Sequence, residues 1–318
     1  MRNILLCVIF MLFISEGFAK EMKVLMIGNS FSICVGNNLP QIVKMSKKHH
    51  LHLTSAYIGG CSLETHANHL KQAEKDPAHK PYRITIWDSA DLRKKNTYSG
   101  NVLELLKNNK YDVITIQQAS HHSWNYATYQ PYANIVIDYI RKFNPQAKIM
   151  VQQTWAYRSD DPRLQPGEKS WGFDQQGMHE RVRAAYHKFA SEKGFELIPA
   201  GDAIALYRKN TPPYKVLSSQ ELAGYKNPDL PPMANDIVGR DFWKKQPDGS
   251  MKLDADRIHL NFRGEYLQAC VWYIALFNED TSTIHYEHPR ISKDACQALA
   301  AAARNVFSNR NTLVHKNR

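Results

Sequence analysis

The sequence predicts an α/β protein, specifically a three-layer α/β/α sandwich with a central parallel sheet. Short apolar segments alternate with helical segments along most of the 318 residues, which is typical of strands joined by crossover helices. The composition is 43% hydrophobic and 22% charged, which excludes a disordered or collagen-like chain. We find no internal repeat, so solenoids and propellers are also excluded.

The first part of the chain begins with an apolar strand at residues 22–27 that ends at Gly28. A helix over residues 40–49 and a second strand over 51–57 follow it. A helix over 62–74 comes next, and Ser62 or Thr65 can cap it. Residues 76–98 contain prolines and one strand-like run at 83–87, so we expect an insertion or a hairpin there.

The middle of the chain repeats the alternation of helix and strand. Pro131 opens one helix, and Val136, Ile140 and Phe143 fall on its apolar face. Gly194 ends another as a left-handed terminal residue. We predict helices over residues 99–109, 131–143 and 177–193, and strands over 112–116, 148–152 and 195–198.

The last part combines a polar stretch with two helices. Residues 210–250 are rich in Pro, Lys, Asp and Asn and predict long surface loops. Residues 264–277 are apolar nearly all round, which favours a buried helix, and residues 295–307 predict a C-terminal helix. We therefore expect residues 20–318 to form one domain with insertions near 76–98 and 210–250.

The first nineteen residues have the pattern of a cleaved signal peptide. Arg2 precedes an apolar run over residues 4–14, and Gly17-Phe18-Ala19 is a small-x-small cleavage signal. This predicts a secreted or periplasmic protein, with an uncleaved anchor as the alternative. No later segment offers enough apolar residues to span a bilayer, so we expect no stable membrane anchor.

The formal net charge is +11, which favours anionic partners such as acidic glycans, lipid headgroups or nucleic acid. The basic residues are scattered, and no nucleic-acid-binding motif is present, so we expect no nucleic-acid partner. The spacing of the histidines fits no metal-ligand motif, so we expect neither a metal nor another cofactor. The pairing of Cys34, Cys61, Cys270 and Cys296 stays open, as does the oligomeric state.

Polar residues stand just after the predicted strands, where parallel sheets bind ligands. Ser30 lies at the turn after the first strand, and a base is needed to activate its hydroxyl. His259 can be that base, and Asp256 can orient its imidazole, with Asp254 as a competing partner. The amides of Ser30 and Gly60, with the side-chain amide of Gln118, can stabilise the oxyanion.

These blocks resemble the SGNH hydrolases, also called GDSL-type esterases. The resemblance rests on Gly28-Asn29-Ser30, Gly60 and Asp256-x-x-His259, and it covers roughly residues 22–277. It implies a flavodoxin-like sandwich and a serine hydrolase acting on ester bonds. Two positions depart from the family: Asn29 replaces an Asp, and no Gly-x-Asn-Asp follows the third strand. Gln118 is our choice for the missing oxyanion donor, and His121 is its rival.

The resemblance and the predicted export favour a secreted esterase acting on acylated carbohydrate. Trp155 and Tyr157 follow the fourth strand and suit stacking on a sugar ring, although Trp155 can instead pack beneath the loop. We expect Trp155 and His121 to contact substrate. The alternatives are a lipid esterase or lysophospholipase on the same triad, and a non-catalytic glycan-binding protein on the same fold.

Overall fold

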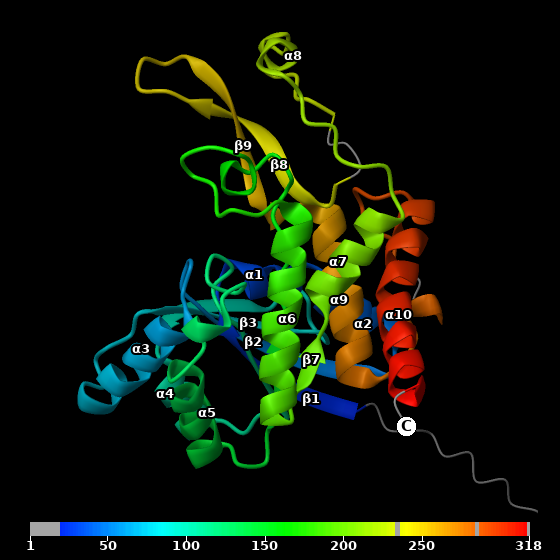
Figure 1. Cartoon of the computed structure of the whole chain (residues 1–318). Coiled ribbons are helices and arrows are strands. Elements are labelled where there is room, and N and C mark those ends of the chain that lie inside the picture. The colour runs from blue at the N-terminus through cyan, green and yellow to red at the C-terminus, as the bar shows by residue number, and fades with distance from the viewer. Residues whose placement is uncertain (1–19, 233–235, 284–285, 317–318) are drawn as a thin grey trace, which may run out of the picture.

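A computed structural model describes residues 20–232, 236–283 and 286–316. Its centre is a seven-stranded sheet in the order β4-β3-β2-β1-β5-β6-β7 (Figure 1). The predicted α/β sandwich with a central parallel sheet is confirmed. The parallel strands are β1 (Lys20–Gly28), β2 (His49–Tyr57), β5 (Val113–Ile116), β6 (Lys148–Gln152) and β7 (Glu196–Ile198).

The two central parallel strands, β1 and β5, form where the sequence is apolar enough to be buried on both faces. Residues 24–27 of β1 and all four residues of β5 are buried. The pairing of Val24 with Leu53 and with Val113 places β1 at the middle of the sheet. Its carboxyl end, where Ser30 follows, is therefore enclosed by neighbouring strands on both sides.

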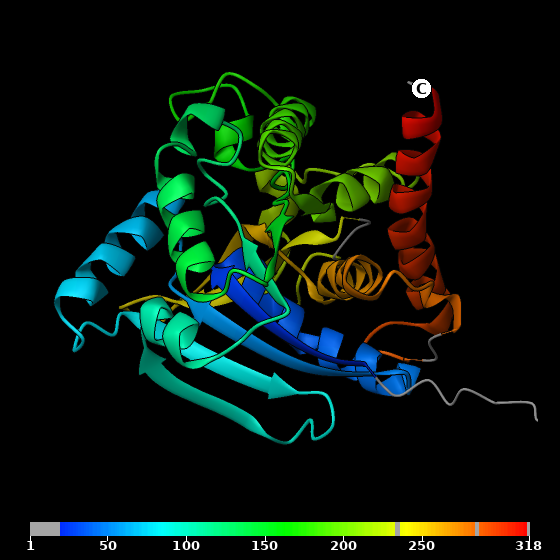
Figure 2. The ribbon, with the colours of Figure 1, turned by 90° about the horizontal axis from the view of Figure 1, so that it is seen from below.

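Helices cover both faces of the sheet (Figure 2). One group packs on one face and consists of α3 (Leu63–Lys75), α4 (Val102–Asn108) and α5 (Tyr132–Phe143). The other group is built around the apolar helix α9 (Phe262–Phe277) and includes α2 (Leu39–Ser46), α7 (Ala200–Lys209) and α10 (Lys293–Lys316). The remaining helices are α1 (Ser30–Ile33), α6 (Gln175–Lys193) and α8 (Ser219–Ala223), with 3-10 helices at Cys34–Asn37, Tyr126–Thr128, Pro162–Leu164 and Thr281–Thr283.

The insertion near residues 76–98 is a hairpin of β3 (Tyr82–Asp88) and β4 (Lys95–Gly100). It pairs antiparallel with β2, so the sheet as a whole is mixed. β4 takes the first residues of the helix that we predicted from Ser99, and α4 begins at Val102 after Asn101 caps it. The exposed polar residues of β4 suit an edge strand.

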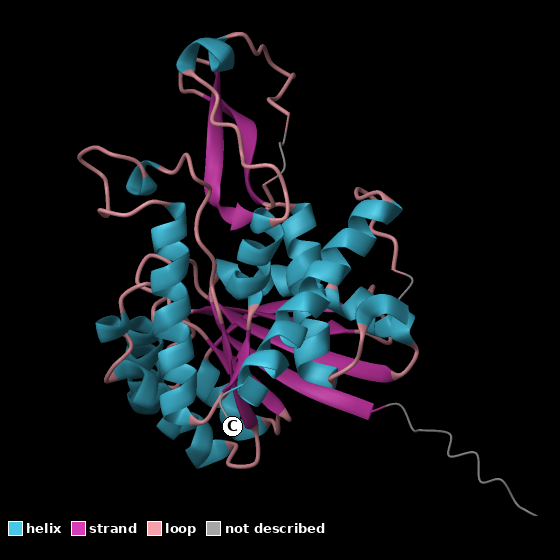
Figure 3. Ribbon diagram, turned by 45° about the vertical axis from the view of Figure 1, so that its right-hand side comes forward, coloured by secondary structure: helices cyan, strands magenta, loops and turns pink. Residues whose placement is uncertain are grey.

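The prediction of loops throughout residues 210–250 is wrong. The strands β8 (Val238–Lys245) and β9 (Met251–Leu260) form an antiparallel ribbon that projects from the sandwich (Figures 1 and 3). Its sequence is mostly polar because both faces of the outer ribbon meet solvent, so the usual alternation of apolar and polar residues is absent. Helix α7 was also missed, since residues 200–209 follow a short strand without a clear capping residue.

The predicted signal peptide at residues 1–19 lies outside the described residues. Among the residues that the structure does describe, no helix is both long and apolar enough to cross a membrane.

Candidate active site

Ser30 is the first residue of α1, directly after the carboxyl end of β1. Asn29 is buried and shapes this turn: its Oδ1 accepts from the amide of Phe31 at 3.0 Å, and its Nδ2 donates to the carbonyl of Cys61 at 3.0 Å. Gln117 donates to the same Oδ1 at 2.6 Å. A Cβ on Gly28 would lie 2.3 Å from the Ser32 hydroxyl, so the turn requires glycine. The turn at Ser30 is therefore held by residues that follow three strands, β1, β2 and β5.

Three side chains meet as the sequence predicted. The hydroxyl of Ser30 lies 2.8 Å from Nε2 of His259, and Nδ1 of His259 lies 2.8 Å from Oδ2 of Asp256. With its proton on Nδ1, the imidazole donates to Asp256 and leaves Nε2 to accept from Ser30. This is the relay that activates a serine nucleophile.

Asp256 and His259 lie near the end of strand β9, not on a loop. The second oxygen of Asp256 accepts from the amides of Ile258 and His259 at 3.0 Å each. Asp254, the competing partner, instead accepts from the amide of Ala255. Asp256 is thus the carboxylate that forms a hydrogen bond with the imidazole of His259.

Burial works against the ionisation of Asp256, but the hydrogen bonds from the His259 side chain and from two backbone amides outweigh it. The pKa of Asp256 is therefore held well below its ordinary value. A carboxylate with a depressed folded-state pKa stabilises the fold above its unfolded pKa, about 3.9 for Asp. It loses that contribution as the pH falls through the folded-state pKa.

We therefore expect the melting temperature to decline below about pH 4, in part because Asp256 must be protonated. The Asp256→Asn variant should show a shallower acid decline than the wild type. Thermal melts between neutral and strongly acidic pH measure both slopes. If the melting temperature falls equally steeply with decreasing pH in both proteins, protonation of Asp256 does not contribute to the acid decline.

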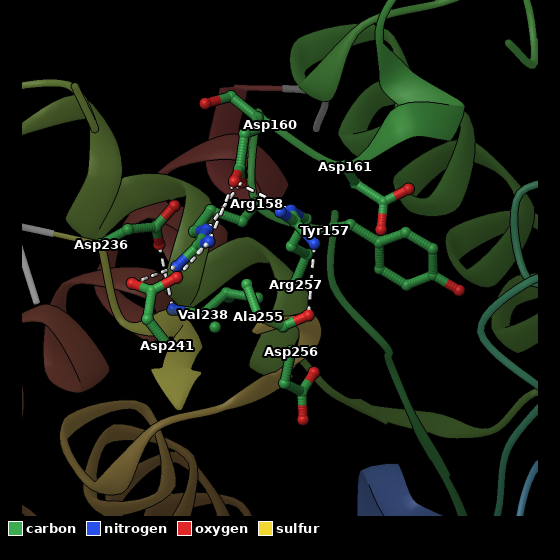
Figure 4. Close-up of polar contacts among 12 residues, drawn as sticks. Tyr157, Arg158, Asp160, Asp161, Asp236, Val238, Asp241, Ala255, Asp256 and Arg257 are labelled. Atoms are coloured by element: carbon green, nitrogen blue, oxygen red, sulfur yellow. Dashed lines mark hydrogen bonds and ion pairs between the residues drawn. The ribbon is translucent and has the colours of Figure 1, made fainter. Parts of the chain in front are cut away.

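A buried ion-pair network connects β9 to the loop after β6 (Figure 4). Arg158 is 3% exposed and contacts two carboxylates, Asp160 at 2.6 Å and Asp241 of β8 at 3.1 Å. Arg257 of β9 pairs with Asp160 at 2.9 Å. The amide of Arg158 also donates to the carbonyl of Arg257 at 2.8 Å. The network thereby holds the strand that carries Asp256 and His259 against the sandwich.

Two backbone amides are placed for an oxyanion. The amides of Ser30 and Gly60 donate no hydrogen bond to any residue in the described part of the chain. Gly60 has a φ of +62°, the left-handed region that glycine adopts readily. Both residues line a cavity of about 300 Å³ that also contacts His259.

The prediction that Gln118 completes the oxyanion site does not agree with the structure. Its side chain is buried, and its Oε1 accepts from the amides of Leu63 at 3.0 Å and Ala119 at 2.8 Å. Its Nε2 donates to the carbonyl of Thr128 at 2.9 Å. Gln118 thus joins three chain segments and does not line the cavity at Ser30.

His121 lines the same cavity as Ser30 and Gly60. Burial, the adjacent His122 ring and the charge of Arg163 lower the pKa of His121. The ring is therefore biased toward its neutral form, which still carries one N–H donor. His121 is the side chain that can supply the third donor to an oxyanion.

His121→Ala should lower kcat by about 10²-fold, the usual cost of removing one oxyanion donor, while the melting temperature stays near that of the wild type. Gln118→Ala should show the opposite pattern, because it leaves buried amides of Leu63 and Ala119 without an acceptor. Steady-state kinetics and thermal melts on both variants separate the two roles. A stable Gln118→Ala protein with a 10²-fold loss of kcat would return the donor role to Gln118.

The prediction that Trp155 contacts substrate is wrong. Trp155 is 1% exposed, stacks on Phe31 with ring centroids 4.3 Å apart, and donates from Nε1 to the carbonyl of Ile258 at 2.9 Å. Trp155 therefore packs against Phe31 and Ile258, the chain neighbours of Ser30 and His259. The neighbouring Tyr157 lines the cavity instead, together with Tyr57 and Arg163.

Several supporting residues were not found from the sequence. Gln117 and Arg158 both stand in polar segments that follow strands, and only the contacts in the folded chain show that Gln117 binds Asn29 and that Arg158 joins Asp160 to Asp241. Arg158-Ser159-Asp160-Asp161 did carry a signal, since a charged run directly after a buried strand marks the sheet edge where sites form.

Apart from the triad, His121 and Cys34, no cysteine or histidine of the described residues lines either cavity at Ser30. Cys34, Cys61, Cys270 and Cys296 are all free thiols, and Cys34 lies in the wall of a second cavity beside Ser30. Glu21, His50 and His52 gather at the opposite end of β1 and β2. Asp88 accepts from His50 there at 2.6 Å, so these rings already have carboxylate partners.

Several solved structures are similar to this chain. A solved structure of a DUF4886 family protein from Bacteroides uniformis is 26% identical, with a TM-score of 0.70, and the match covers 91% of this chain and 95% of that one. A candidate SGNH hydrolase from Slackia heliotrinireducens is 18% identical with a TM-score of 0.46, covering 80% and 97%. A candidate GDSL-like lipase from Parabacteroides merdae is 12% identical with a TM-score of 0.44, covering 81% and 96%.

No curated protein matches the sequence. The Gly-Asn-Ser, Gly60 and Asp-x-x-His blocks, on which the predicted resemblance to the SGNH hydrolases rests, lie together near the carboxyl end of the central strand β1. The model of a domain of unknown function, DUF4886, matches residues 23–214, which include Ser30 and Gly60. The chain therefore belongs to the DUF4886 family.

Proposed function

We propose that this protein is a serine esterase that hydrolyses ester bonds through an acyl-enzyme. The observation that carries the proposal is the continuous hydrogen-bonded series from Ser30 through His259 to Asp256, with both links at 2.8 Å. Two free backbone amides and the His121 ring stand beside the same hydroxyl. A nucleophile, a base, an orienting carboxylate and oxyanion donors are the groups that acyl transfer needs.

The reaction proceeds in two halves. Ser30 Oγ attacks the ester carbonyl while Nε2 of His259 takes the hydroxyl proton, and the carbonyl oxygen becomes an oxyanion held by the amides of Ser30 and Gly60. Collapse breaks the bond to the alkoxy oxygen, which leaves as an alcohol with the proton from His259. A water molecule then attacks the acyl-enzyme with His259 again as base, releasing the acid and restoring Ser30.

The substrate within this proposal is an O-acylated carbohydrate, met after export. The leader-like residues 1–19 support export. Tyr57 and Tyr157 in the cavity wall support a sugar ring or another flat group beside the ester. A lipid ester on the same triad is the competing substrate. The charged groups around the second cavity at Ser30 favour the polar substrate.

The test is hydrolysis of p-nitrophenyl esters from acetate to octanoate, together with labelling by a fluorophosphonate. We expect turnover that is fastest with acetate, and covalent labelling of the peptide that contains Ser30. Fastest turnover with octanoate would support the lipid esterase instead. No turnover and no labelling would contradict the proposal and would favour a glycan-binding protein on this fold.

A further inference from the structure

A second cavity, of about 480 Å³, also opens onto Ser30 and His259. Its walls come from three places: the inserted hairpin β3–β4, the projecting ribbon β8–β9, and the region of α1 and α9. The parallel strands contribute little to it. The insertion that distinguishes this sheet from a purely parallel one thus borders the reacting serine.

Three cationic side chains line this cavity. Arg83 and Lys95 come from the hairpin, and Arg240 lies directly opposite Asp256 in the ribbon. The guanidinium of Arg83 stands 4.4 Å from the ring centre of Tyr57, and the ammonium of Lys95 stands 5.4 Å from that of Trp87. Two of the cations therefore rest on aromatic faces, which hold them in position without neutralising them.

None of these three cations forms an ion pair with a carboxylate within residues 20–232, 236–283 and 286–316. Other arginines of the chain are paired, as Arg158 is with Asp160 and Arg208 with Asp236. Three cations without a carboxylate partner in the described chain thus line one cavity beside the reacting hydroxyl. Such a cluster creates a positive electrostatic potential in the cavity, and this potential attracts anions.

One carboxyl group shares the cavity, Glu265 at the start of α9. Burial raises the pKa of Glu265, while a hydrogen bond from Asn37 and the charges of Arg290 and Arg240 oppose that rise. The amide of Asn37 donates to Glu265 at 3.0 Å. A single carboxyl group cannot balance three cations, so the cavity keeps an excess of positive charge.

We infer that this cavity binds a carboxylate group of the substrate, close to the ester that Ser30 attacks. The inference rests on the proposed esterase function and names its substrate class: esters that carry a negative charge. Arginine side chains bind carboxylates through paired N–H donors, and Ile33, Trp87 and Leu260 in the same wall offer apolar surface for the carbon skeleton. The charge can stand on the alcohol part or on the acyl part of the ester.

Matched pairs of esters separate these two placements. For the alcohol part, 4-acetoxybenzoate is compared with neutral 4-acetoxybenzamide. For the acyl part, mono-p-nitrophenyl succinate is compared with neutral p-nitrophenyl butyrate. We expect kcat/KM to favour the anionic member of at least one pair by about tenfold or more at low ionic strength, and salt to reduce the preference.

The variants Arg83→Gln, Lys95→Gln and Arg240→Gln should bring that ratio toward one. Lys94→Gln is the matched control: its neighbour in sequence lines the cavity, but Lys94 itself is 79% exposed and lies 3.9 Å from Asp91. It removes the same charge and should keep the wild-type ratio. A wild-type ratio near one for both pairs, or an equal effect of Lys94→Gln, would overturn the inference.

The two proposals fail in different ways. If neutral esters are turned over and Ser30 is labelled but charge makes no difference, only the carboxylate site is wrong. If no ester is turned over, binding of benzoate and benzamide measured by calorimetry tests the cavity directly. Benzoate binding that weakens in Arg83→Gln and not in Lys94→Gln would keep the anion site while rejecting the esterase, and equal binding of both compounds would reject the site.

Discussion

Replacing Ser30 with alanine is expected to lower kcat for p-nitrophenyl acetate by about four to six orders of magnitude, the cost of losing a triad serine. The variant keeps the oxyanion amides and both cavities but has no atom to form the acyl-enzyme. His259→Ala should cost a similar factor, because an unactivated hydroxyl is a poor nucleophile. The double variant should be no slower than either single one, since the two groups act in one step.

Ser32→Ala is the matched control for Ser30→Ala. Ser32 belongs to the same short helix, is buried, and donates to the carbonyl of Asn29 at 3.1 Å. It contacts neither cavity at the reacting hydroxyl. We expect it to lower stability slightly and to keep the burst of p-nitrophenol that acyl-enzyme formation produces. A Ser30→Ala protein that turns over at the wild-type rate would rule out this nucleophile.

Replacing Arg158 with methionine is expected to lower the free energy of unfolding by about 3–5 kcal/mol, because breaking a buried ion pair leaves uncompensated charge. Asp160 and Asp241, whose side chains are 13% and 10% exposed, would lose their common partner. Chemical denaturation with urea measures the loss. Activity should fall as well, because the strand bearing Asp256 and His259 loses its attachment to the loop after β6.

Arg93→Met is the control for this stability prediction. Arg93 also pairs with an aspartate, Asp91 at 3.2 Å, but its side chain is 91% exposed. We expect it to change stability by less than about 1 kcal/mol, as for exposed pairs in general. Adding Asp160→Asn and Asp241→Asn to the Arg158→Met background should restore part of the lost stability. Equal destabilisation by Arg158→Met and Arg93→Met would contradict the structural role of the network.

The parallel core and the triad were predictable because each has a local signature. Strands β1, β5 and β6 are short apolar runs, and Ser30 directly follows the first of them. His259 and Asp256 are three residues apart, so one short segment contains both. Each of these segments is therefore visible from local spacing, whereas the contact between Ser30 and His259, which lie 229 residues apart, depends on the fold.

The ribbon β8–β9 and the roles of Gln118 and Trp155 depend on contacts that sequence spacing does not show. Gln118 and His121 stand three residues apart, and both are polar residues after the same strand. Only the position of Leu63 and Thr128 shows that Gln118 is engaged elsewhere. Trp155 is an aromatic residue just after a strand of the parallel sheet, where ligands bind, yet it is buried in contact with Phe31 and Ile258.

The residues proposed to bind the substrate carboxylate and the residues proposed to react lie in different segments of the chain, because the former include two side chains of the hairpin β3–β4. In the proposed esterase Ser30, Asp256 and His259 perform the reaction, whereas Arg83 and Lys95 belong to a hairpin added at one side of the sheet. Evolution can therefore alter this hairpin without moving the reacting atoms, since β4 is the edge strand and β3 alone joins the hairpin to the parallel strands. We expect DUF4886 relatives to keep the serine turn while their hairpins diverge in charge, and exchange of this hairpin between relatives offers a route to new esterase selectivities.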